Sequence, residues 1–480
     1  MALLRLVKAY QKILAALFGI LFVVAGTTVA LRWAKGYRFN FSKQGPTMAG
    51  TGLLVASSDP KGAQVYLNGK LTTATDDTLN LPPGSYEVEI KKDGFLAWKK
   101  TLEVTAELVT QTTAKLFPSV PNLTPLTFTG VSGPVPSPDG QKIVYRVDSA
   151  ENEAKNGLWI LELSERNFAV ARTSEPKQIA RNTSQYDFST AKLVWTPDSS
   201  QILAYWQEEG RRKKEVGSRP TIAKAVLLNT GGMNDQADFK DATPRLPVLL
   251  SQWYQDLDAK DKIRIKELPE FMQELATVSA QVAYFSPDEK RLLYSSRRDL
   301  NIPEGLVADL PAESTQPEDR DVKVGSLYVY DIEEDRNYVI ANTKKPMAEN
   351  LKSETYWSRR LADDRVKWEE ATESGGQKKP VSLPPVPEEL LADILEDLPS
   401  RYSPIWELGI QWFPTSAHLL AAGESGISIT EYDGTNNSVV YSGPAEENFV
   451  YPWPNGSRLA ILTNFNDQNS PTNLYAINLK

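Results

Sequence analysis

The chain has one histidine, His418, and a few regularly spaced aspartates, and these are the residues whose types and spacing could do chemistry. A serine-hydrolase triad needs a histidine as general base, and His418 would have to supply it. His418 lies four residues after Pro414, in a phrase that recurs along the chain. The same position in the other copies is also polar: Lys142, Gln201, Arg291 and Arg458. We therefore expect His418 to be an exposed structural residue at the start of a strand.

The recurring aspartates Asp139, Asp198 and Asp288 each follow a proline within a Ser/Thr-Pro-Asp phrase. An aspartate in this position accepts hydrogen bonds from the backbone of a tight turn. Because each repeat contributes one such aspartate, we expect them to be spread around the molecule and not to meet at one site. The turn residues to which we assign this structural role are Pro138, Asp139, Pro197, Asp198, Pro287, Asp288, Pro414 and Pro454.

Other catalytic chemistry finds little support in the residue types. Cysteine is absent, which excludes disulfides, thiolate metal sites and cysteine nucleophiles. The adjacent carboxylates Asp76-Asp77 and Asp363-Asp364 are isolated pairs, so we interpret them as solvated loops and predict no metal site. Gly231-Gly232 is too short for a phosphate-binding loop, so we predict no cofactor. Carboxylate pairs for glycoside cleavage stay open, because 61 acidic residues offer many pairs.

Each Pro-centred turn lies within a repeated unit of short strands, and these strands must position any functional side chains. A strand precedes each phrase, a second follows it, and a third carries an apolar alternation, as in residues 158–163. A fourth strand follows in most copies. Four-strand units of roughly 40 residues are typical of propeller blades, and the copies predict five to six blades within residues 118–480. We expect residues 125–129 to complete the last blade and close the ring.

Two insertions interrupt the repeats. Residues 252–277 place apolar side chains partly at helical spacing, which predicts an amphipathic helix. Residues 342–405 are highly charged and contain a proline-rich run, with a short helix expected over residues 388–398. This second insertion leaves room for a degenerate sixth blade.

A smaller β domain is predicted for residues 50–117, after a linker at residues 32–49. Its strands alternate apolar and polar residues, and Asn68-Gly69 is a strong hairpin signal because both residues tolerate positive φ. We expect an antiparallel, half-buried unit. Its turn motifs are built from Pro60, Gly62, Ala63, Asn68, Gly69, Pro83, Gly84 and Gly94.

These motifs resemble the PEGA domain, a small β-sandwich found in many bacterial and archaeal surface proteins. The naming motif is present as Pro60-Lys61-Gly62-Ala63, with lysine in place of glutamate at the second position. The change falls in a solvent-facing turn. The resemblance implies presentation or binding outside the membrane, and it carries over no catalytic residue.

The longer repeats are similar to the WD-like β-propeller repeats of the periplasmic Tol-system propeller and its relatives. The first three copies match the Pro-Asp pattern well, whereas Thr415 and Asn455 replace the aspartate in the last two. The resemblance covers most of residues 125–480. It implies a binding platform more often than an enzyme.

A basic segment, residues 1–12, precedes an uncharged apolar stretch at residues 13–31. At a rise of 1.5 Å per residue this stretch extends roughly 28 Å, close to the ~30 Å hydrocarbon core of a bilayer. It predicts one transmembrane helix acting as a signal anchor, with a cleaved signal peptide as the alternative. We expect the large C-terminal region outside the cytoplasm. The residues predicted to span the membrane are Ile13, Leu14, Leu17, Phe18, Ile20, Leu21, Phe22, Val23, Val24, Val29 and Leu31.

Charge is divided unevenly along the chain. Seven of the 53 basic residues and none of the 61 acidic ones lie in residues 1–48. The rest of the chain carries 46 bases and 61 acids, a formal charge of −15. A body this acidic repels phosphate backbones, so we predict no nucleic-acid partner.

The predicted fold is all-β: an N-terminal transmembrane helix, a small PEGA-like β-sandwich, and a β-propeller with helical insertions. The predicted function is non-enzymatic, a membrane-anchored extracytoplasmic binding or scaffold protein whose partner is a protein or a cell-envelope polymer. Two alternatives stay open. One is a propeller-based polysaccharide lyase or hydrolase, and the other is a self-associating structural component of the envelope.

Overall fold

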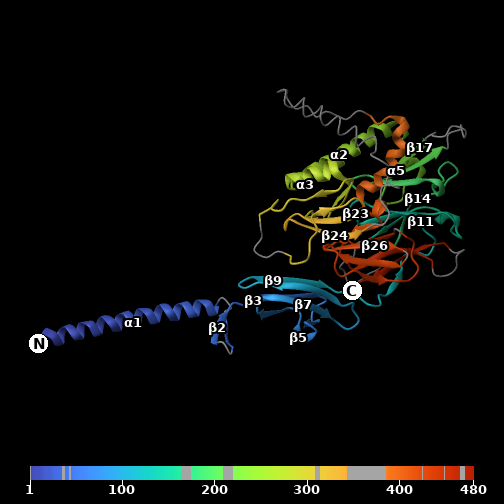
Figure 1. Ribbon diagram of the computed structural model, residues 1–480. Coiled ribbons are helices and arrows are strands. Elements are labelled where there is room, and N and C mark those ends of the chain that lie inside the picture. Colours follow the sequence, from blue (N-terminus) through green and yellow to red (C-terminus); the bar gives the residue numbers. More distant parts are fainter. Residues whose placement is uncertain are drawn as a thin grey trace, which may run out of the picture. The chain divides into compact units, whose positions relative to one another are not determined.

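The chain divides into two compact units, which are described separately. The first contains Met1–Phe117 and Asp309–Pro317, and the second contains Pro118–Ala308 and Glu318–Lys480. Figure 1 shows the elements in the order of the sequence. The computed structural model describes residues 2–34, 38–42, 45–163, 175–208, 220–308, 314–342, 385–423, 425–447, 449–464 and 471–480.

The first element is the helix α1, Ala2–Ala34. Among the described residues, no helix combines the length and the apolar character needed to cross a membrane. The predicted membrane-spanning helix over residues 13–31 is therefore wrong.

The correction applies to the whole set of residues predicted to span the membrane. The side chains of Ile13 and Leu14 lie outside the described residues. The other members are exposed on α1: Leu17, Phe18, Ile20, Leu21, Phe22, Val23, Val24, Val29 and Leu31.

A short antiparallel hairpin follows the helix, formed by β1, Arg38–Ser42, and β2, Gly45–Ala49.

Two small sheets with one shared core form the rest of the first unit. One sheet has the order β6, Asp77–Leu81, then β3, Gly52–Asp59, then β9, Val109–Lys115. The other has the order β5, Lys70–Ala74, β4, Gln64–Leu67, β7, Gly84–Lys91, and β8, Trp98–Val104. Alternate residues of β3 are buried, which matches its apolar alternation. The strands β3 and β9 pair in parallel, so the expectation of a wholly antiparallel unit is wrong.

The second unit contains five four-stranded antiparallel sheets among its described residues, and the predicted β-propeller is confirmed. Blade 1 consists of β11, Ser132–Pro136, β12, Lys142–Val147, β13, Gly157–Glu162, and β14, Lys177–Arg181. Blade 2 consists of β15, Lys192–Trp195, β16, Gln201–Glu208, β17, Thr221–Asn229, and β18, Lys240–Asp241. Blade 3 consists of β19, Ala280–Phe285, β20, Arg291–Ser296, β23, Ser326–Asp331, and β24, Arg336–Asn342.

Blades 4 and 5 complete the set. Blade 4 consists of β25, Ile410–Trp412, β26, His418–Gly423, β27, Gly426–Glu431, and β28, Ser438–Tyr441. Blade 5 consists of β29, Val450–Pro452, β30, Arg458–Thr463, β31, Asn473–Asn478, and β10, Leu123–Pro125. A small hairpin beside blade 3 joins β21, Leu300–Asn301, to β22, Asp321–Val322.

Blade 5 closes the ring with strands from opposite ends of the unit. The strand β10 pairs antiparallel with β31, with Leu123 opposite Ile477 and Pro125 opposite Tyr475. The predicted closure is confirmed, although its strand lies at residues 123–125 instead of 125–129. Pairing β10 with β31 covers an edge of the sheet that would otherwise offer unpaired backbone groups.

Apolar clusters join most neighbouring blades. Central strands are buried on both faces, as in β23, because each sheet stacks on others in the ring. Blade 1 packs on blades 2 and 5, and blade 3 packs on blade 4. Blade 2 instead buries its other face against helices α2, Leu246–Lys266, and α5, Leu391–Tyr402. We call this pair of helices the helical wedge.

The helical wedge also reaches blade 3. The side chain of Arg264 on α2 forms a 2.7 Å ion pair with Glu289, in the turn between β19 and β20. Tyr284 of β19 donates a hydrogen bond of 2.7 Å to the carbonyl of Ser400 on α5. In Figure 1, α2 and α5 lie together at the top of the second unit. The wedge thus stands between blades 2 and 3. Residues 343–384, most of the insertion 342–405 that leaves room for a degenerate sixth blade, lie outside the described residues.

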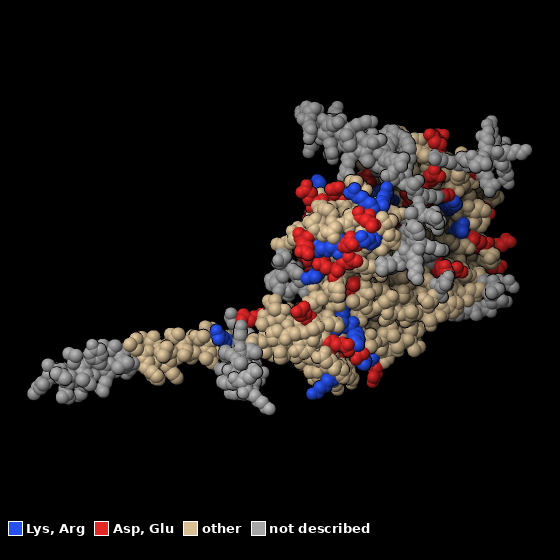
Figure 2. Space-filling view, viewed as in Figure 1, with Lys and Arg blue, Asp and Glu red and all other residues tan. Residues whose placement is uncertain are grey.

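Short helices complete the second unit. The helix α3, Glu270–Glu274, and the π-helical turn Leu275–Ser279 pack on blade 3 through Met272 and Leu275. The helix α6, Ile405–Leu408, leads directly into β25. Figure 2 shows acidic and basic side chains interspersed on the described surface near α2 and α3.

Candidate functional site

A pocket of about 540 Å³ opens where segments from three blades converge. Val135 belongs to β11, Gly409 precedes β25 and Phe449 precedes β29, so each blade contributes at or near its first strand. First strands of separate blades meet only around the axis of a ring, which places the pocket at one end of the central channel. The pocket is lined by Gly133, Pro134, Val135, Ile405, Trp406, Glu407, Leu408, Gly409, Glu446, Glu447, Phe449 and Leu462.

The local sequence of α6 explains how two functional side chains reach the pocket. Ile405 is buried and anchors the helix, while Trp406 beside it is exposed. The helix ends at Gly409, whose φ of 63° is a left-handed conformation that glycine adopts without strain. This stop turns the chain into β25 after a single helical turn. Trp406 and Glu407 are therefore held on a short, firmly anchored support at the pocket.

The rim of the pocket combines carboxylates with an aromatic ring. Glu446 and Glu447 are exposed, and the backbone amide of Glu446 is fixed by a 2.8 Å hydrogen bond to the carbonyl of Leu462. Trp406 is 40% exposed. Carboxylates and an indole ring both attract cations, the first by ion pairing and the second through its π face. The arrangement can therefore bind a cationic group carried on an apolar stem.

Glu407 lies deeper and is tied to blade 3. Its Oε2 atom is 2.8 Å from the hydroxyl of Tyr284. Burial raises the pKa of Glu407; its hydrogen bond with Tyr284 and the charge of Arg401 act against this rise, while the charge of Asp397 adds to it. Burial likewise raises the pKa of Tyr284 well above its ordinary value.

Behind the pocket, Arg401 of α5 fastens the two helices of the wedge together. Its guanidinium lies 3.1 Å from Asp258 and 2.8 Å from Asp261, both on α2. Burial raises the pKa of Asp258, although the charge of Arg401 opposes the rise. Tyr402 then donates a 3.1 Å hydrogen bond to the carbonyl of Trp195 in β15. This cluster positions α6 and the pocket floor relative to blade 2.

A second cavity of about 570 Å³ lies at blade 2, away from the first strands. Its lining comes from the loop after β17 and from the segment around Phe239, and it includes Gly231, Gly232 and Asn234. Asn234 is buried and holds the loop through hydrogen bonds to the carbonyls of Ile179 and Asn229. Its one charged lining residue is Lys240, whereas three glutamates line the first pocket, so the first pocket offers more groups for binding or catalysis.

The turn residues predicted from the sequence lie in separate blades. Asp139 Oδ1 accepts from Ser137 Oγ at 2.5 Å and from the amide of Gln141 at 3.1 Å. Asp198 and Asp288 accept the same pair of bonds in blades 2 and 3. The structure does not bring these aspartates together. The residues after the motif adopt left-handed backbone conformations in every copy: Gly140, Ser199, Glu289, Ser416 and Gly456.

Two of these turns are also linked to the next blade, a contact that sequence reasoning missed. The amide of Asp139 donates to Ser199 Oγ at 3.0 Å, and the amide of Asp288 donates to Ser416 Oγ at 3.0 Å. The available signal was a serine in the fourth position of the phrase in blades 2 and 4. In blade 5, Pro454 is followed by Asn455, whose Oδ1 accepts from the amide of Ser457 at 2.9 Å.

His418 is only 5% exposed, so the expectation of an exposed histidine is wrong. Its ring lies edge-on to Phe413, with centroids 6.1 Å apart. The turn that contains Pro414 connects these two residues and brings the phenyl ring over the imidazole. Within the described part of the chain, no group of three or more His, Asp or Glu side chains is placed to hold a metal ion.

The motif residues of the smaller domain form turns. Ala63 is buried and its amide donates to Thr75 Oγ1 at 2.9 Å. Asn68 and Gly69, with φ of 48° and 77°, join β4 to β5 in the tight turn their types favour. The carbonyl of Pro60 accepts from Ser58 at 2.7 Å. The remaining motif glycines also have positive φ: Gly62, Gly84 and Gly94. Pro83 lies between β6 and β7.

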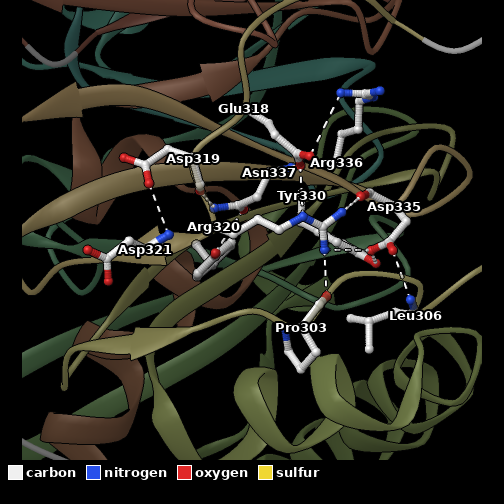
Figure 3. Close-up of polar contacts among 11 residues, drawn as sticks. Pro303, Leu306, Glu318, Asp319, Arg320, Asp321, Tyr330, Asp335, Arg336 and Asn337 are labelled. Carbon is white, nitrogen blue, oxygen red and sulfur yellow. Dashed lines mark hydrogen bonds and ion pairs between the residues drawn. The ribbon is translucent and has the colours of Figure 1, made fainter.

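A partly buried polar network braces the small hairpin beside blade 3 (Figure 3). The guanidinium of Arg320 contacts Glu318 at 3.1 Å and the carboxylate of Asp335 at 3.4 Å, and it donates to the carbonyl of Pro303 at 2.6 Å. Asp335 also accepts from Tyr330 at 2.8 Å. These groups face one another in the close-up and satisfy each other, so we assign the network a structural role.

Comparison with known proteins identifies one part of the chain directly. The PEGA domain family matches residues 51–119, so the small β domain is a PEGA domain. No curated protein matches the chain in sequence. Solved structures also match the chain, but their sequence identities and TM-scores are too low to carry an argument about it.

Three of the similar solved structures illustrate this. TolB from Agrobacterium tumefaciens shares 11% identity, over 74% of this chain and 83% of that one, with a TM-score of 0.21. TolB from Acinetobacter baumannii shares 10% identity, over 87% and 64%, with a TM-score of 0.19. The acylaminoacyl peptidase of Pyrococcus horikoshii shares 12% identity, over 90% and 52%, with a TM-score of 0.20. This chain thus spans about half the length of the peptidase, and scores this low carry no argument about activity.

Proposed function

We propose that the chain is an extracytoplasmic protein-binding platform whose propeller takes up a basic segment of a partner protein in the channel pocket. The observation that carries the proposal is the composition of this pocket. Exposed Glu446 and Glu447 stand beside exposed Trp406, and the apolar side chains of Val135 and Phe449 lie among the other lining residues. A lysine or arginine side chain presents the matching pattern of an apolar stem and a cationic head.

Charge supports the same class of partner. The chain carries a formal net charge of −8, so a basic partner is attracted to it over distances longer than direct contact. Tryptophan at the centre of an interface contributes strongly to binding because it buries a large area with few rotatable bonds. We therefore expect Trp406 to supply most of the affinity, and the two glutamates to select for a cationic residue.

The test is binding of the full chain to short synthetic peptides that differ in charge, measured by fluorescence anisotropy. We expect a lysine- or arginine-containing peptide with a flanking aromatic residue to bind, and its acidic counterpart not to bind. Trp406→Ala and the double variant Glu446→Gln, Glu447→Gln should each weaken binding at least about tenfold. The matched control is Phe128→Ala, which removes another exposed aromatic ring of the second unit and should leave binding unchanged.

A glycan-cleaving enzyme is the second candidate, favoured by the convergence of three carboxylates on the same pocket. Glu407 has a raised pKa, while Glu446 and Glu447 are exposed, and glycosidases use one protonated and one ionised carboxylate. Incubation of the full chain with acidic and neutral polysaccharides separates the two functions. Release of reducing ends that is abolished by Glu407→Gln would replace the binding proposal, and an absence of cleavage with peptide binding would retain it.

A further inference from the structure

Glu407 lines the pocket, and its carboxylate forms a row of three oxygen atoms with Tyr284 and Ser400, spaced as two hydrogen bonds in series. The hydroxyl oxygen of Tyr284 is 2.7 Å from the carbonyl oxygen of Ser400 and 2.8 Å from Glu407 Oε2. A tyrosine hydroxyl carries one proton, and a backbone carbonyl can only accept. The hydroxyl can therefore donate to one of these two neighbours but not to both.

An ionised Glu407 leaves this arrangement one proton short. If Tyr284 donated to the carboxylate, its lone pairs would face the carbonyl of Ser400 at hydrogen-bonding distance. If it donated to Ser400, two electron-rich oxygens would face each other between Tyr284 and Glu407. Both situations are repulsive, and in a partly buried site the repulsion is weakly screened. A proton on Glu407 removes the conflict, because the carboxylic acid donates to Tyr284 and Tyr284 donates to Ser400.

We propose that Glu407 is held as a neutral carboxylic acid, and that a cationic group entering the pocket displaces its proton to solvent. The first half of this inference stands on the oxygen geometry alone, whereas the second half rests on the proposed binding function for the class of ligand. The exchange is balanced in charge: one cation binds and one proton leaves. Affinity for the cation should therefore rise with pH until Glu407 is ionised in the free protein.

The charged groups around Glu407 act in both directions. Asp397 of α5 disfavours a further negative charge, and two more acidic residues, Glu446 and Glu447, line the same pocket. Arg401 favours it, but its guanidinium is already engaged by Asp258 and Asp261 on α2. Tyr284 of β19 is the direct hydrogen-bonding partner. The raised pKa of Glu407, caused chiefly by burial, agrees with the proton count.

The first experiment detects the proton without any ligand. Infrared difference spectra of the full chain, wild type against Glu407→Gln, are recorded at neutral pH. We expect the wild type to show a protonated-carboxyl stretching band that Glu407→Gln lacks, and the control Glu447→Gln to keep it. Glutamine can still donate to Tyr284 through its amide group, so the variant retains the hydrogen-bond order and should fold. Identical spectra of wild type and Glu407→Gln would overturn the inference.

The second experiment measures proton release on binding. An acetylated Arg-Trp dipeptide amide is titrated into the full chain by calorimetry in two buffers of different ionisation enthalpy. We expect the wild type to release about one proton per bound probe and Glu407→Gln to release none while still binding. Binding without proton release would contradict the coupling between cation binding and proton release, and it would leave the proposed binding function intact. Failure of the probe to bind, with the infrared band present, would count against the binding function and leave the neutral Glu407 standing.

Discussion

At the residue scale, the carboxylate of Asp198 is fixed by donors from its own turn. Thr196 Oγ1 donates at 2.5 Å and the amide of Ser200 at 3.1 Å. Burial raises the pKa of Asp198, but these hydrogen bonds outweigh it and the pKa is lowered overall. A carboxylate whose pKa is lower in the folded state stabilises the fold above its unfolded pKa, near 3.9.

We expect Asp198→Asn to lower the melting temperature at neutral pH. The difference from wild type should shrink as pH falls through the folded pKa of Asp198, because the wild-type carboxylate is then protonated as well. Thermal unfolding across an acid pH series measures this, with Asp256→Asn on the exposed side of α2 as control. A difference that stays constant down to the most acidic pH would show that the charge of Asp198 is not the stabilising element.

The serine that links one turn to the next gives a second prediction. Ser416 is buried and accepts from the amide of Asp288 at 3.0 Å. Ser416→Ala removes the acceptor and should cost about 0.5–1.5 kcal/mol in the free energy of unfolding, the net contribution of a typical hydrogen bond, because the donor belongs to the exposed residue Asp288. The control is Ser200→Ala, since Ser200 is exposed and bonds within its own turn. Equal stability of the two variants would contradict a link between blades 3 and 4.

Sequence reasoning at this scale succeeds where contacts are local. The donors to each turn aspartate lie within two residues of it, so the residue types alone suggest the geometry. The exposure of His418 was predicted wrongly because the equivalent residues in the other repeats are polar. Their polarity does not indicate that Phe413 packs against the imidazole ring. The pocket was missed for a different reason. Its lining comes from four separate segments that share no motif, around Val135, Trp406, Glu446 and Leu462.

At the element scale, the helical wedge is held chiefly by apolar packing. Leu395 and Leu398 of α5 are fully buried in a cluster with Leu250 and Trp253 of α2. The core of the wedge therefore combines two segments that lie far apart in the chain and the face of blade 2. Without it, blade 2 would expose this face to solvent.

We expect Leu395→Ala to lower the free energy of unfolding by about 2–5 kcal/mol, the cost of a buried cavity of this size. Ile263→Ala on α2 is the matched control, because Ile263 is exposed and should change stability by no more than about 0.5 kcal/mol. Chemical denaturation of both variants measures the difference. Comparable losses would mean that the wedge packs elsewhere.

Elements with a strong local pattern were predictable, and those set by distant partners were not. The helix expected over residues 388–398 corresponds to a short 3-10 turn, Glu388–Leu390, followed by α5. The first insertion starts its helix at Leu246, earlier than the expected residue 252, because Pro247 is well accommodated in the first helical turn. The parallel pairing of β3 with β9 joins strands from opposite ends of the domain, and alternation within each strand cannot reveal it.

At the scale of the whole molecule, the ring depends on one short strand. β10 contributes the register from Leu123 to Pro125 against β31, and the adjoining amide of Leu126 donates to Leu474 at 2.8 Å. Deleting residues 123–125 exposes the edge of β31 and should lower the melting temperature of the propeller clearly. Replacing residues 119–121 by Gly-Ser-Gly, which alters the preceding connector at constant length, is the control. An unchanged melting temperature on deletion would show that closure contributes little.

The five repeated turns and the closing strand could be predicted from the sequence, because each described blade repeats the same turn, whereas the sequence left the blade count at five or six. The position of the wedge in the ring could not, since it depends on which blade faces are left without a neighbouring sheet. Only the packing of Leu246 and Leu391 against blade 2 reveals this.

The pairing of β10 with β31 also determines when the propeller can close during synthesis of the chain. Thr124 and the Asn478 amide group that bonds to it are 354 residues apart in the chain. At roughly 5–20 residues per second, a ribosome needs on the order of 20–70 s to make the segment between them. During that time β10 has left the ribosome but has no partner strand, and blade 1 has no blade 5 to cover it. The nascent propeller is thus an open arc for most of its synthesis, and protection of its exposed ends falls to whatever binds unfinished chains.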